Sequence, residues 1–235
     1  MEDILKRIAG ASTLPLLWRQ MTRYFGRHGF GAVSYYWLRA TTHLPATMPL
    51  QHGFSRDEID LYLSLDFQHL DIVPRAALAA GRPIRWSKVW RGPEITGEER
   101  GFLAALRDAK VTDGFSLPCY GPNGRNAVVG LGRMNTKTDA SADHLALLHF
   151  AAQAAHLRIC ALFTEETPRE KHLSAREKEI LDWVARGKSN GVIAEILKIA
   201  PGTVDTYMRR IYEKLEVSDR TSAAVKGVGL GLIAA

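Results

Sequence analysis

Near the C-terminal end of the chain, apolar residues recur at helical spacing in three successive segments. The first segment opens with Ser174 and Glu177, the two positions of a capping box, and continues to Gly187, a residue type that ends helices. Ser189 is placed to cap a second, shorter helix. The inward faces of these two helices are expected to carry Ile180, Leu181, Val184, Ile193, Ile196 and Leu197.

The third segment begins at Pro201, a residue favoured in the first turn of a helix. One face is polar and basic, and the other repeats apolar residues at Val204, Met208, Ile211 and Leu215. Two helices joined by a tight turn, the second with an outward basic face, predict a helix-turn-helix that enters the DNA major groove. The alternative is an ordinary three-helix bundle with solvated charges. A last short helix is expected from Thr221 to about Gly229.

The upstream pattern alternates helical and strand periods. Helices are expected over residues 2–9 and 15–25, after the capping boxes Ser55–Glu58 and Thr96–Glu99, and from Pro74 to Gly81. Strands are expected over 32–37, 47–51, 115–120 and 127–135, the last two joined through the turn sequence GPNG. A long apolar helix then opens at Asp139 or Ser141 and runs to about Phe163.

These elements predict an α+β protein of two domains. We expect an N-terminal α/β/α sandwich on an antiparallel sheet over 1–163, and a C-terminal all-α helix-turn-helix domain of four helices over 173–235. The polar segment 164–172 (TEETPREKH), which contains Pro168, separates the two apolar patterns and is the expected linker.

Net charge, cysteine content and apolar runs indicate which binding partners and which cellular compartment to expect. The net charge is +6, but the residues from 170 onward hold 11 Lys and Arg against 9 Asp and Glu, so positive charge is not concentrated in the helical domain. The two cysteines show no disulfide or metal spacing, which favours a reducing cytoplasm. We see neither a signal-peptide pattern nor an apolar run of about 18 residues, and expect no membrane partner.

The sequence shows no catalytic constellation. Nothing resembles a nucleophile elbow, a phosphate loop or a paired-carboxylate site, so we expect no enzyme activity and no cofactor. His144, His149 and His156 lack the spacing of a zinc-binding helix, and are expected at the surface or at an interface rather than on a metal.

The C-terminal motifs carry a specific resemblance. In order, LSAREKEIL, WVARGKSN, IAEIL, PGTV and IYEKLEVSDRT resemble the DNA-binding domain of the LuxR family of transcription regulators. By this resemblance Glu177 and Gly187 match the glutamate and the helix-ending glycine of the first helix. The Thr-Val and Lys-Leu pairs that bound the family's recognition helix match Thr203, Val204, Lys214 and Leu215.

Three positions depart from the family pattern. Ala200 stands where serine is usual, so the recognition helix loses a cap worth ~1 kcal/mol. Tyr207 replaces a common histidine, and Asp205 places a negative charge on the DNA-facing side, where it would accept a bond from cytosine N4 or lower non-specific affinity. The candidate DNA contacts are Lys188, Ser189, Asn190, Thr203, Asp205, Thr206, Arg209, Arg210 and Lys214.

The upstream domain resembles the autoinducer-binding domain of the same family more faintly, through Tyr62, Asp71, Pro83, Trp86 and Gly114. In members that bind acyl-homoserine lactones, the aspartate accepts the ligand amide N–H and the tyrosine bonds the acyl carbonyl. The tryptophan packs against the lactone ring. The resemblance gives these roles to Asp71, Tyr62 and Trp86. The plainer interpretation is that Asp71 caps the Pro74 helix while both aromatics fill the core.

One departure from the family pattern affects which ligand the domain is expected to bind. The family has a second tryptophan, four residues before the tyrosine, that donates to the lactone carbonyl; here that residue is Glu58, and an ionised carboxylate only accepts. Glu58 either caps its helix and faces solvent or meets a donor on the ligand. Phe54 removes a further hydroxyl. The candidate ligand site is Tyr62, Asp71, Trp86, Phe54, Glu58, Ser116 and Phe102.

We therefore expect a cytoplasmic, ligand-responsive transcription regulator. Its expected partners are a double-stranded DNA operator, a second copy of the chain, RNA polymerase and a small-molecule signal, either an acyl-homoserine lactone or a related compound. The dimer surfaces are expected on residues 142–163 and 221–229.

The alternatives to this function are an orphan regulator with a non-lactone ligand, and a ligand-independent regulator whose aromatics fill its pocket. A phosphorylation-controlled response regulator would need an early alternating βα pattern with an acidic pocket, which we do not see.

Overall fold

The computed structural model describes residues 1–38, 50–64, 71–92, 95–108, 113–166 and 173–233. The chain divides into two compact units, one built from Met1–Gly121 and Arg125–Glu165, the other containing Glu166–Ala235. Most of the expected linker, and residues 47–49 of an expected strand, lie outside the described residues.

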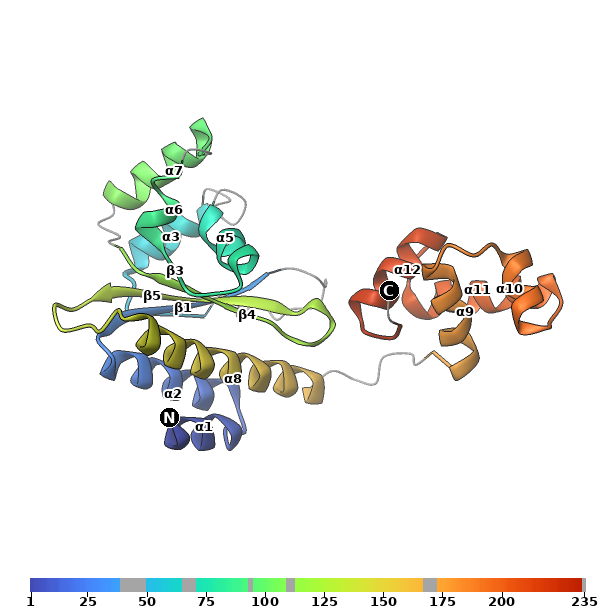
Figure 1. The fold of residues 1–235 in the computed structure, drawn as a ribbon, viewed down its shortest axis with the longest axis horizontal. Coiled ribbons are helices and arrows are strands. Elements are labelled where there is room, and N and C mark those ends of the chain that lie inside the picture. The colour runs from blue at the N-terminus through green and yellow to red at the C-terminus, as the bar shows by residue number, and fades with distance from the viewer. Residues whose placement is uncertain (39–49, 65–70, 93–94, 109–112, 167–172, 234–235) are drawn as a thin grey trace. The chain divides into compact units, whose positions relative to one another are not determined.

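The first unit is built on a five-stranded antiparallel sheet (Figure 1). The strand order is β2 (Leu50–His52), β1 (Phe30–Leu38), β5 (Asn126–Met134), β4 (Phe115–Cys119) and β3 (Ile84–Arg85). The antiparallel sheet is confirmed. Strand β3 was not predicted, because two residues are too few to show an alternating pattern. A short 3₁₀ turn, Pro122–Gly124, joins β4 to β5 where the GPNG turn was expected.

One face of the sheet is covered by α2 (Leu14–Arg27) and α8 (Ala142–Glu166), and α1 (Glu2–Ala9) packs against α2 on the side away from the sheet (Figure 1). Their buried side chains form one core with the strand residues on that face, among them Leu17, Phe25, Tyr35, Leu131, Leu148 and Ile159. Helix α8 is apolar enough, by length and composition alone, to cross a membrane over Ala142–Phe163, which the expectation from sequence missed. Half of that stretch is buried within the unit, as expected of a core helix.

The other face carries α3 (Arg56–Ser64), α5 (Ile72–Ala80), α6 (Trp86–Val89) and α7 (Gly97–Asp108). The predicted capping boxes Ser55–Glu58 and Thr96–Glu99 are both formed. Helix α5 begins two residues before Pro74, because Asp71 caps it by accepting the Val73 N–H. Pro74 is tolerated there, since the first turn of a helix leaves its N–H groups unpaired anyway.

The second unit contains α9 (Ala175–Ala185), α10 (Asn190–Leu197), α11 (Pro201–Leu215) and α12 (Arg220–Gly229) around one apolar core. The Ser174–Glu177 capping box is formed, and Gly187 takes a left-handed φ of 74° where α9 ends. One core residue was predicted wrongly. Ile196 is 40% exposed, whereas Ala194 is 2% exposed, because the inward stripe of α10 runs through Ile193, Ala194 and Leu197.

The predicted surface location of the three histidines is wrong for His156. Its side chain is fully buried on α8, where Nδ1 lies 2.7 Å from the Tyr35 hydroxyl and Nε2 lies 2.6 Å from the Arg125 carbonyl oxygen. The Arg125 carbonyl accepts only, so Nε2 carries the proton and Nδ1 accepts from Tyr35. Burial lowers the pKa of His156 to about 4, although the Arg125 carbonyl favours the charged form.

Candidate functional site

Tyr62 and Asp71 are brought together by α3 and α5, on the face of the sheet that also carries α6 and α7. The Tyr62 hydroxyl, on α3, donates to Asp71 Oδ2 at 2.9 Å, while Asp71 Oδ1 caps α5 at 3.0 Å. Burial and the neighbouring carboxylate raise the pKa of Tyr62, so the phenol keeps its proton and acts as the donor. Burial likewise raises the pKa of Asp71 to about 6, although the Val73 N–H, Tyr62 and Arg75 favour the ionised form. The plainer interpretation of Asp71 as a cap is confirmed, but the cap uses only one of its oxygens.

Trp86 opens α6 and lies against the sheet. Its indole Nε1 donates to the Ser116 hydroxyl at 2.9 Å. The ring is packed so closely over glycines that a Cβ on Gly114 would lie 2.7 Å from it, and one on Gly132 would lie 3.1 Å from it. These glycines therefore make room for the indole, and the hydrogen bond fixes its orientation. The two residues are 30 positions apart in the chain, so the sequence alone did not suggest that they are partners.

A row of polar side chains crosses the same face of the sheet. Ser34 pairs in register with Gln51 on one side and Gly130 on the other, and Gly130 pairs with Ser116. Ser34 and Ser116 are both buried. Gln51 donates its amide to the Tyr36 hydroxyl at 3.3 Å. Polar groups are thus spread over a sheet face that helices cover, which is unusual for a purely structural core.

The side chains of Tyr36, Tyr62, Trp86, Trp90 and Phe102, which we call the aromatic enclosure, pack together beside this polar row. The Tyr62 ring lies 5.3 Å from Tyr36 and 6.2 Å from Phe102 on α7, between ring centroids. Trp90, directly after α6, lies 6.0 Å from Trp86. Phe102 is buried with Leu103, and Tyr62 and Trp90 pack against that pair. Of the predicted site residues, the structure therefore gathers Tyr62, Asp71, Trp86, Ser116 and Phe102.

Glu58 forms an ion pair with Arg133. In addition to its capping role, its carboxylate accepts from Arg133 on β5 at 2.7 and 3.0 Å. Burial opposes ionisation, but the Ser55 N–H and Arg133 outweigh it, and the pKa of Glu58 is lowered. The predicted cap is present, whereas the predicted solvent-facing position is wrong, since the side chain is only 9% exposed. Phe54 lies just before α3 and is half-buried.

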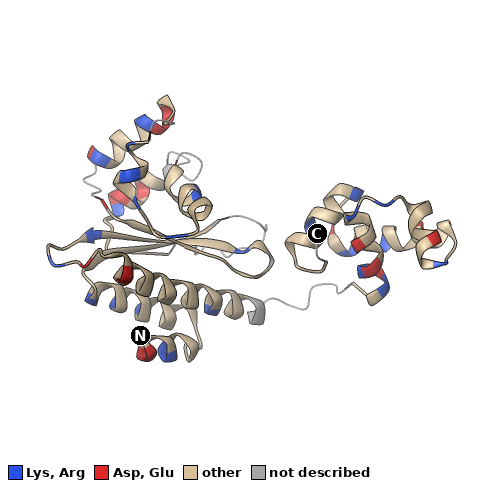
Figure 2. Cartoon of the chain, in the orientation of Figure 1, with Lys and Arg blue, Asp and Glu red and all other residues tan. Residues whose placement is uncertain are grey.

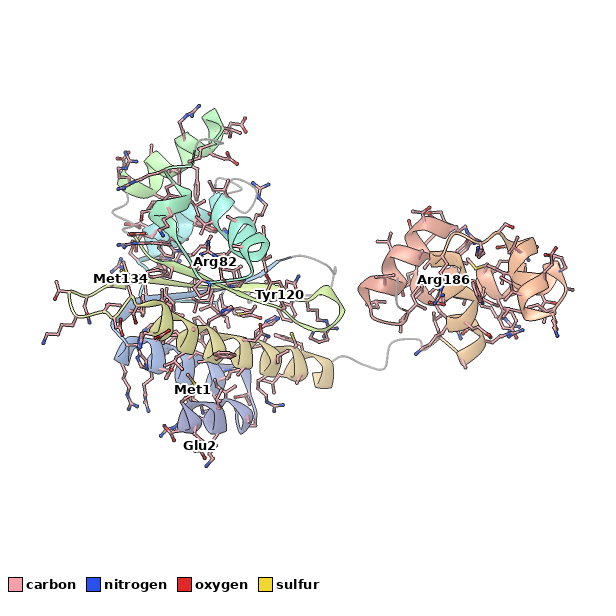
Figure 3. All side chains as sticks on the ribbon, in the orientation of Figure 1. Met1, Glu2, Arg82, Tyr120, Met134 and Arg186 are labelled. Carbon is pink, nitrogen blue, oxygen red and sulfur yellow. The ribbon has the colours of Figure 1, made fainter. Side chains whose placement is uncertain are left out.

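An open groove of about 880 Å³ lies elsewhere on this unit, at the edge strand β3. Residues from β3, α6 and α8 contribute to its lining, as do Arg82 and Tyr120, which are labelled in Figure 3. None of the seven predicted ligand residues, all of which the structure describes, belongs to that lining. The polar and aromatic side chains that the sequence singled out therefore meet at a different place, under α3, α5 and α6.

The second unit presents a polar face on α11. Exposed side chains on this helix include Thr203, Asp205, Thr206, Arg209 and Arg210, and Lys188 and Ser189 are exposed just before α10. Figure 2 shows both signs of charge on these helices, in agreement with the small net charge of this part of the sequence. The Ser189 hydroxyl caps α10, whereas Ala200 provides no side-chain cap for α11, as predicted.

Two predicted DNA contacts, Asn190 and Asp205, bond each other directly, and Arg220, which the sequence did not single out, holds Asn190 from its other side. Asn190 donates to Asp205 Oδ1 at 2.7 Å and accepts from Arg220 at 2.8 Å. Arg220, in the first turn of α12, also donates to the Lys188 carbonyl. The three side chains thus fix the amide orientation of Asn190 and bridge α10, α11 and α12. Their separation along the chain gave no local signal for this network.

Lys214 has a structural partner. Its ammonium lies 2.7 Å from Glu177 Oε2, and Glu177 is 2% exposed. Burial opposes ionisation of Glu177, but Lys214 and the Ser174 backbone N–H stabilise the carboxylate more strongly, so the pKa of Glu177 is lowered. This pair joins the start of α9 to the end of α11, and so sets the angle between them.

Comparison with known proteins agrees with this architecture. Residues 15–159 match the autoinducer binding domain profile, and residues 171–226 match that of bacterial regulatory proteins, luxR family. The chain is 30% identical over 186 residues to the quorum sensing-dependent transcriptional regulator RpaR of Rhodopseudomonas palustris, covering 79% of this chain and 75% of that protein. It is 32% identical over 163 residues to the putative HTH-type transcriptional regulator y4qH of Sinorhizobium fredii, with 69% of this chain but only 49% of that protein covered.

The fold also matches a solved structure. SdiA of Escherichia coli superposes with a TM-score of 0.79 at 20% identity, covering 100% of this chain and 98% of SdiA. At that identity the match establishes the fold alone, while the sequence profiles establish the family. The chain therefore belongs to the luxR family of bacterial regulatory proteins, with an autoinducer-binding domain followed by a helix-turn-helix domain.

Proposed function

We propose that this chain is a cytoplasmic homodimer that binds a small acyl signal through its first unit and a DNA operator through α11. Binding of the signal stabilises the first unit and the dimer, because a ligand that binds only the folded state shifts the equilibrium toward it. The dimer sets two recognition helices about one DNA turn apart, and RNA polymerase is the further partner.

The observation that carries the DNA-binding proposal is the exposed face of α11. Its Arg209 and Arg210 are exposed, and the Arg210 guanidinium lies 5.8 Å from the Tyr207 ring. Arginine forms bidentate bonds to guanine in the major groove, and asparagine does so to adenine. Asn190 is already held by Asp205 and Arg220, so we assign base reading to Arg209 rather than to Asn190.

Signal binding is supported by the polar side chains enclosed under α3, α5 and α6. An apolar and aromatic enclosure with a few converging polar groups is typical of a small-molecule site. Asp71 and Tyr62 hold each other there, and the Asp71 carboxylate is placed to accept from a ligand amide N–H, while the one Tyr62 hydroxyl proton is donated to Asp71. A second candidate function is ligand-independent regulation, favoured by the Trp86 indole N–H, which is already paired with Ser116.

The dimer proposal rests on an exposed apolar stripe along α8. Leu147, Phe150 and Leu157 face away from the sheet, and Phe150 is 67% exposed. On α12, Val225 and Val228 are also exposed. Exposed apolar side chains at helical spacing are expected to be covered by a partner, and self-complementary faces of this kind form two-fold dimers.

Replacing Arg209 with Ala tests the DNA-binding proposal. Fragments that the purified chain enriches from sheared genomic DNA of its source bacterium serve as probes in a fluorescence anisotropy titration. Loss of a base-reading arginine costs about 1–3 kcal/mol in affinity for the enriched fragment, with little change toward random DNA. Arg107→Ala, an exposed arginine of the first unit, is the charge-matched control. Equal affinities of Arg209→Ala and wild type would rule out this role.

A further inference from the structure

Trp90 carries a buried hydrogen-bond donor for which no described residue is the partner. Its indole Nε1 is shielded from solvent and makes no hydrogen bond with any residue that the structure describes. A buried donor left unpaired costs about 1–3 kcal/mol, and an indole nitrogen can only donate. The nearby indole of Trp86 shows what a satisfied donor looks like in this unit, because its Nε1 is bonded to Ser116.

The position of Trp90 links it to the signal site. Its side chain packs against the cluster of Trp86 and Val128 on the sheet, and also against Phe102 and Leu103 on α7. Tyr62, the partner of Asp71, packs against the same Phe102. The unpaired N–H therefore lies within the aromatic enclosure that holds the Tyr62–Asp71 pair.

A second unpaired polar atom lies at the other end of this enclosure. Gln51 Oε1 is buried without a partner among the described residues, while the amide nitrogen of the same side chain donates to Tyr36. The contacts run from Gln51 through Tyr36, Tyr62 and Phe102 to Trp90. Among the described residues, the Gln51 oxygen at one end of the enclosure thus lacks a donor, and the Trp90 N–H at the other end lacks an acceptor. Glu58 supplies neither, because Arg133 and Ser55 occupy its carboxylate.

We infer that the Trp90 indole N–H donates to a carbonyl oxygen of the bound signal, which is a small acyl amide or acyl ester. An acyl chain suits the aromatic side chains, and the carbonyl satisfies an indole donor for which the described residues provide no acceptor. In an amide, the N–H offers a donor to the acceptors of this enclosure, Asp71 and Gln51. This inference rests on the proposed function, since it assigns a ligand contact within the proposed signal site.

Trp90→Phe tests the inference, because it keeps the aromatic ring and removes only the donor and part of the ring volume. The probes are N-octanoyl-homoserine lactone, an amide, and 1-octanoylglycerol, an ester. Wild type, Trp90→Phe and the control Trp18→Phe are compared by calorimetric titration. We expect Trp90→Phe to bind the better probe ~10-fold or more weakly, whereas Trp18→Phe, on α2, binds it as wild type does. Without ligand, Trp90→Phe should melt no lower than Trp18→Phe, since an unpaired buried donor has been removed.

The wild-type protein provides a second measurement that does not depend on how the variants fold. The five tryptophans give separate indole ¹H–¹⁵N resonances, and the resonance missing in Trp90→Phe should move downfield when wild type is saturated with the better probe. Equal probe affinity of Trp90→Phe and wild type, an unmoved resonance, or failure of both probes to bind wild type would overturn the inference. Loss of promoter selectivity together with intact, Trp90-dependent probe binding would instead contradict the DNA-binding part of the proposed function.

Discussion

At the scale of single residues, Asp71 combines a structural role with a chemical one. One carboxylate oxygen caps α5, and the other accepts the Tyr62 hydroxyl. Both bonds favour the charged form, yet burial prevails and raises the pKa of Asp71 from its ordinary value of 3.8 to about 6. Near neutral pH the group is ionised but poorly solvated, which makes it a ready acceptor for a ligand N–H.

This raised pKa predicts a pH-dependent contribution to stability. Between about pH 4 and pH 6 the unfolded state releases the Asp71 proton while the folded state keeps it, so the contribution of Asp71 falls as pH rises through this window. Asp71→Asn retains a capping oxygen and does not titrate. The free energy of unfolding of wild type minus that of Asp71→Asn, from urea titrations without ligand, should therefore decrease by on the order of 1–3 kcal/mol from pH 4 to pH 7. A constant or rising difference would contradict the raised pKa.

Some residues of the candidate sites were predicted from the sequence, and others were not. Tyr62, Asp71 and Trp86 were predicted as site residues because their spacing matches a family motif. Their hydrogen bonds, from Tyr62 to Asp71 and from Trp86 to Ser116, became visible only in the fold. Trp90, Gln51, Arg133 and Arg220 were missed, since their roles depend on partners far away in the chain. A single sequence marks residues by type and spacing, whereas an unpaired N–H becomes visible only when the surrounding atoms are placed.

At the scale of helices and strands, the helix starts were predicted most accurately where capping residues are present. The three capping boxes begin α3, α7 and α9 as predicted, because each is a short-range exchange of backbone and side-chain hydrogen bonds. The elements β3 and α6 were not predicted, since both are too short to show a period, and β3 depends on its pairing with β4. The start of α5 was misplaced because proline was given more weight than the aspartate before it.

The uncapped recognition helix gives a prediction at this scale. Ala200 has the extended backbone of an N-cap, with φ −69° and ψ 143°, but no side chain to accept the N–H groups of α11. Ala200→Ser should raise the free energy of unfolding of the second unit by ~1 kcal/mol, and Ser189→Ala, which removes the cap of α10, should lower it by a similar amount. Native-state hydrogen exchange of the α9–α12 amides measures both. A loss of protection in Ala200→Ser would show that the backbone there does not admit a cap.

At the scale of the whole molecule, the proposed dimer face on α8 can be tested directly. Phe150→Lys places a charge at the centre of the stripe formed by Leu147, Phe150 and Leu157. We expect wild type to sediment as a dimer at micromolar concentration, and Phe150→Lys to sediment as a monomer with unchanged circular dichroism. Leu5→Lys, at a partly exposed leucine of α1, is the control and should remain dimeric. A monomeric wild type, or a dimeric Phe150→Lys, would place the dimer interface elsewhere.

The central claim is that α11 recognises particular DNA sequences. The most direct measurement is selection of sheared genomic DNA by the purified full-length chain, followed by sequencing of the retained fragments. We expect enrichment of a small set of promoter fragments that share an inverted repeat with half-sites about one DNA turn apart, and loss of that enrichment in Arg209→Ala. Retention of fragments in proportion to their abundance, by a folded and dimeric wild type, would contradict it.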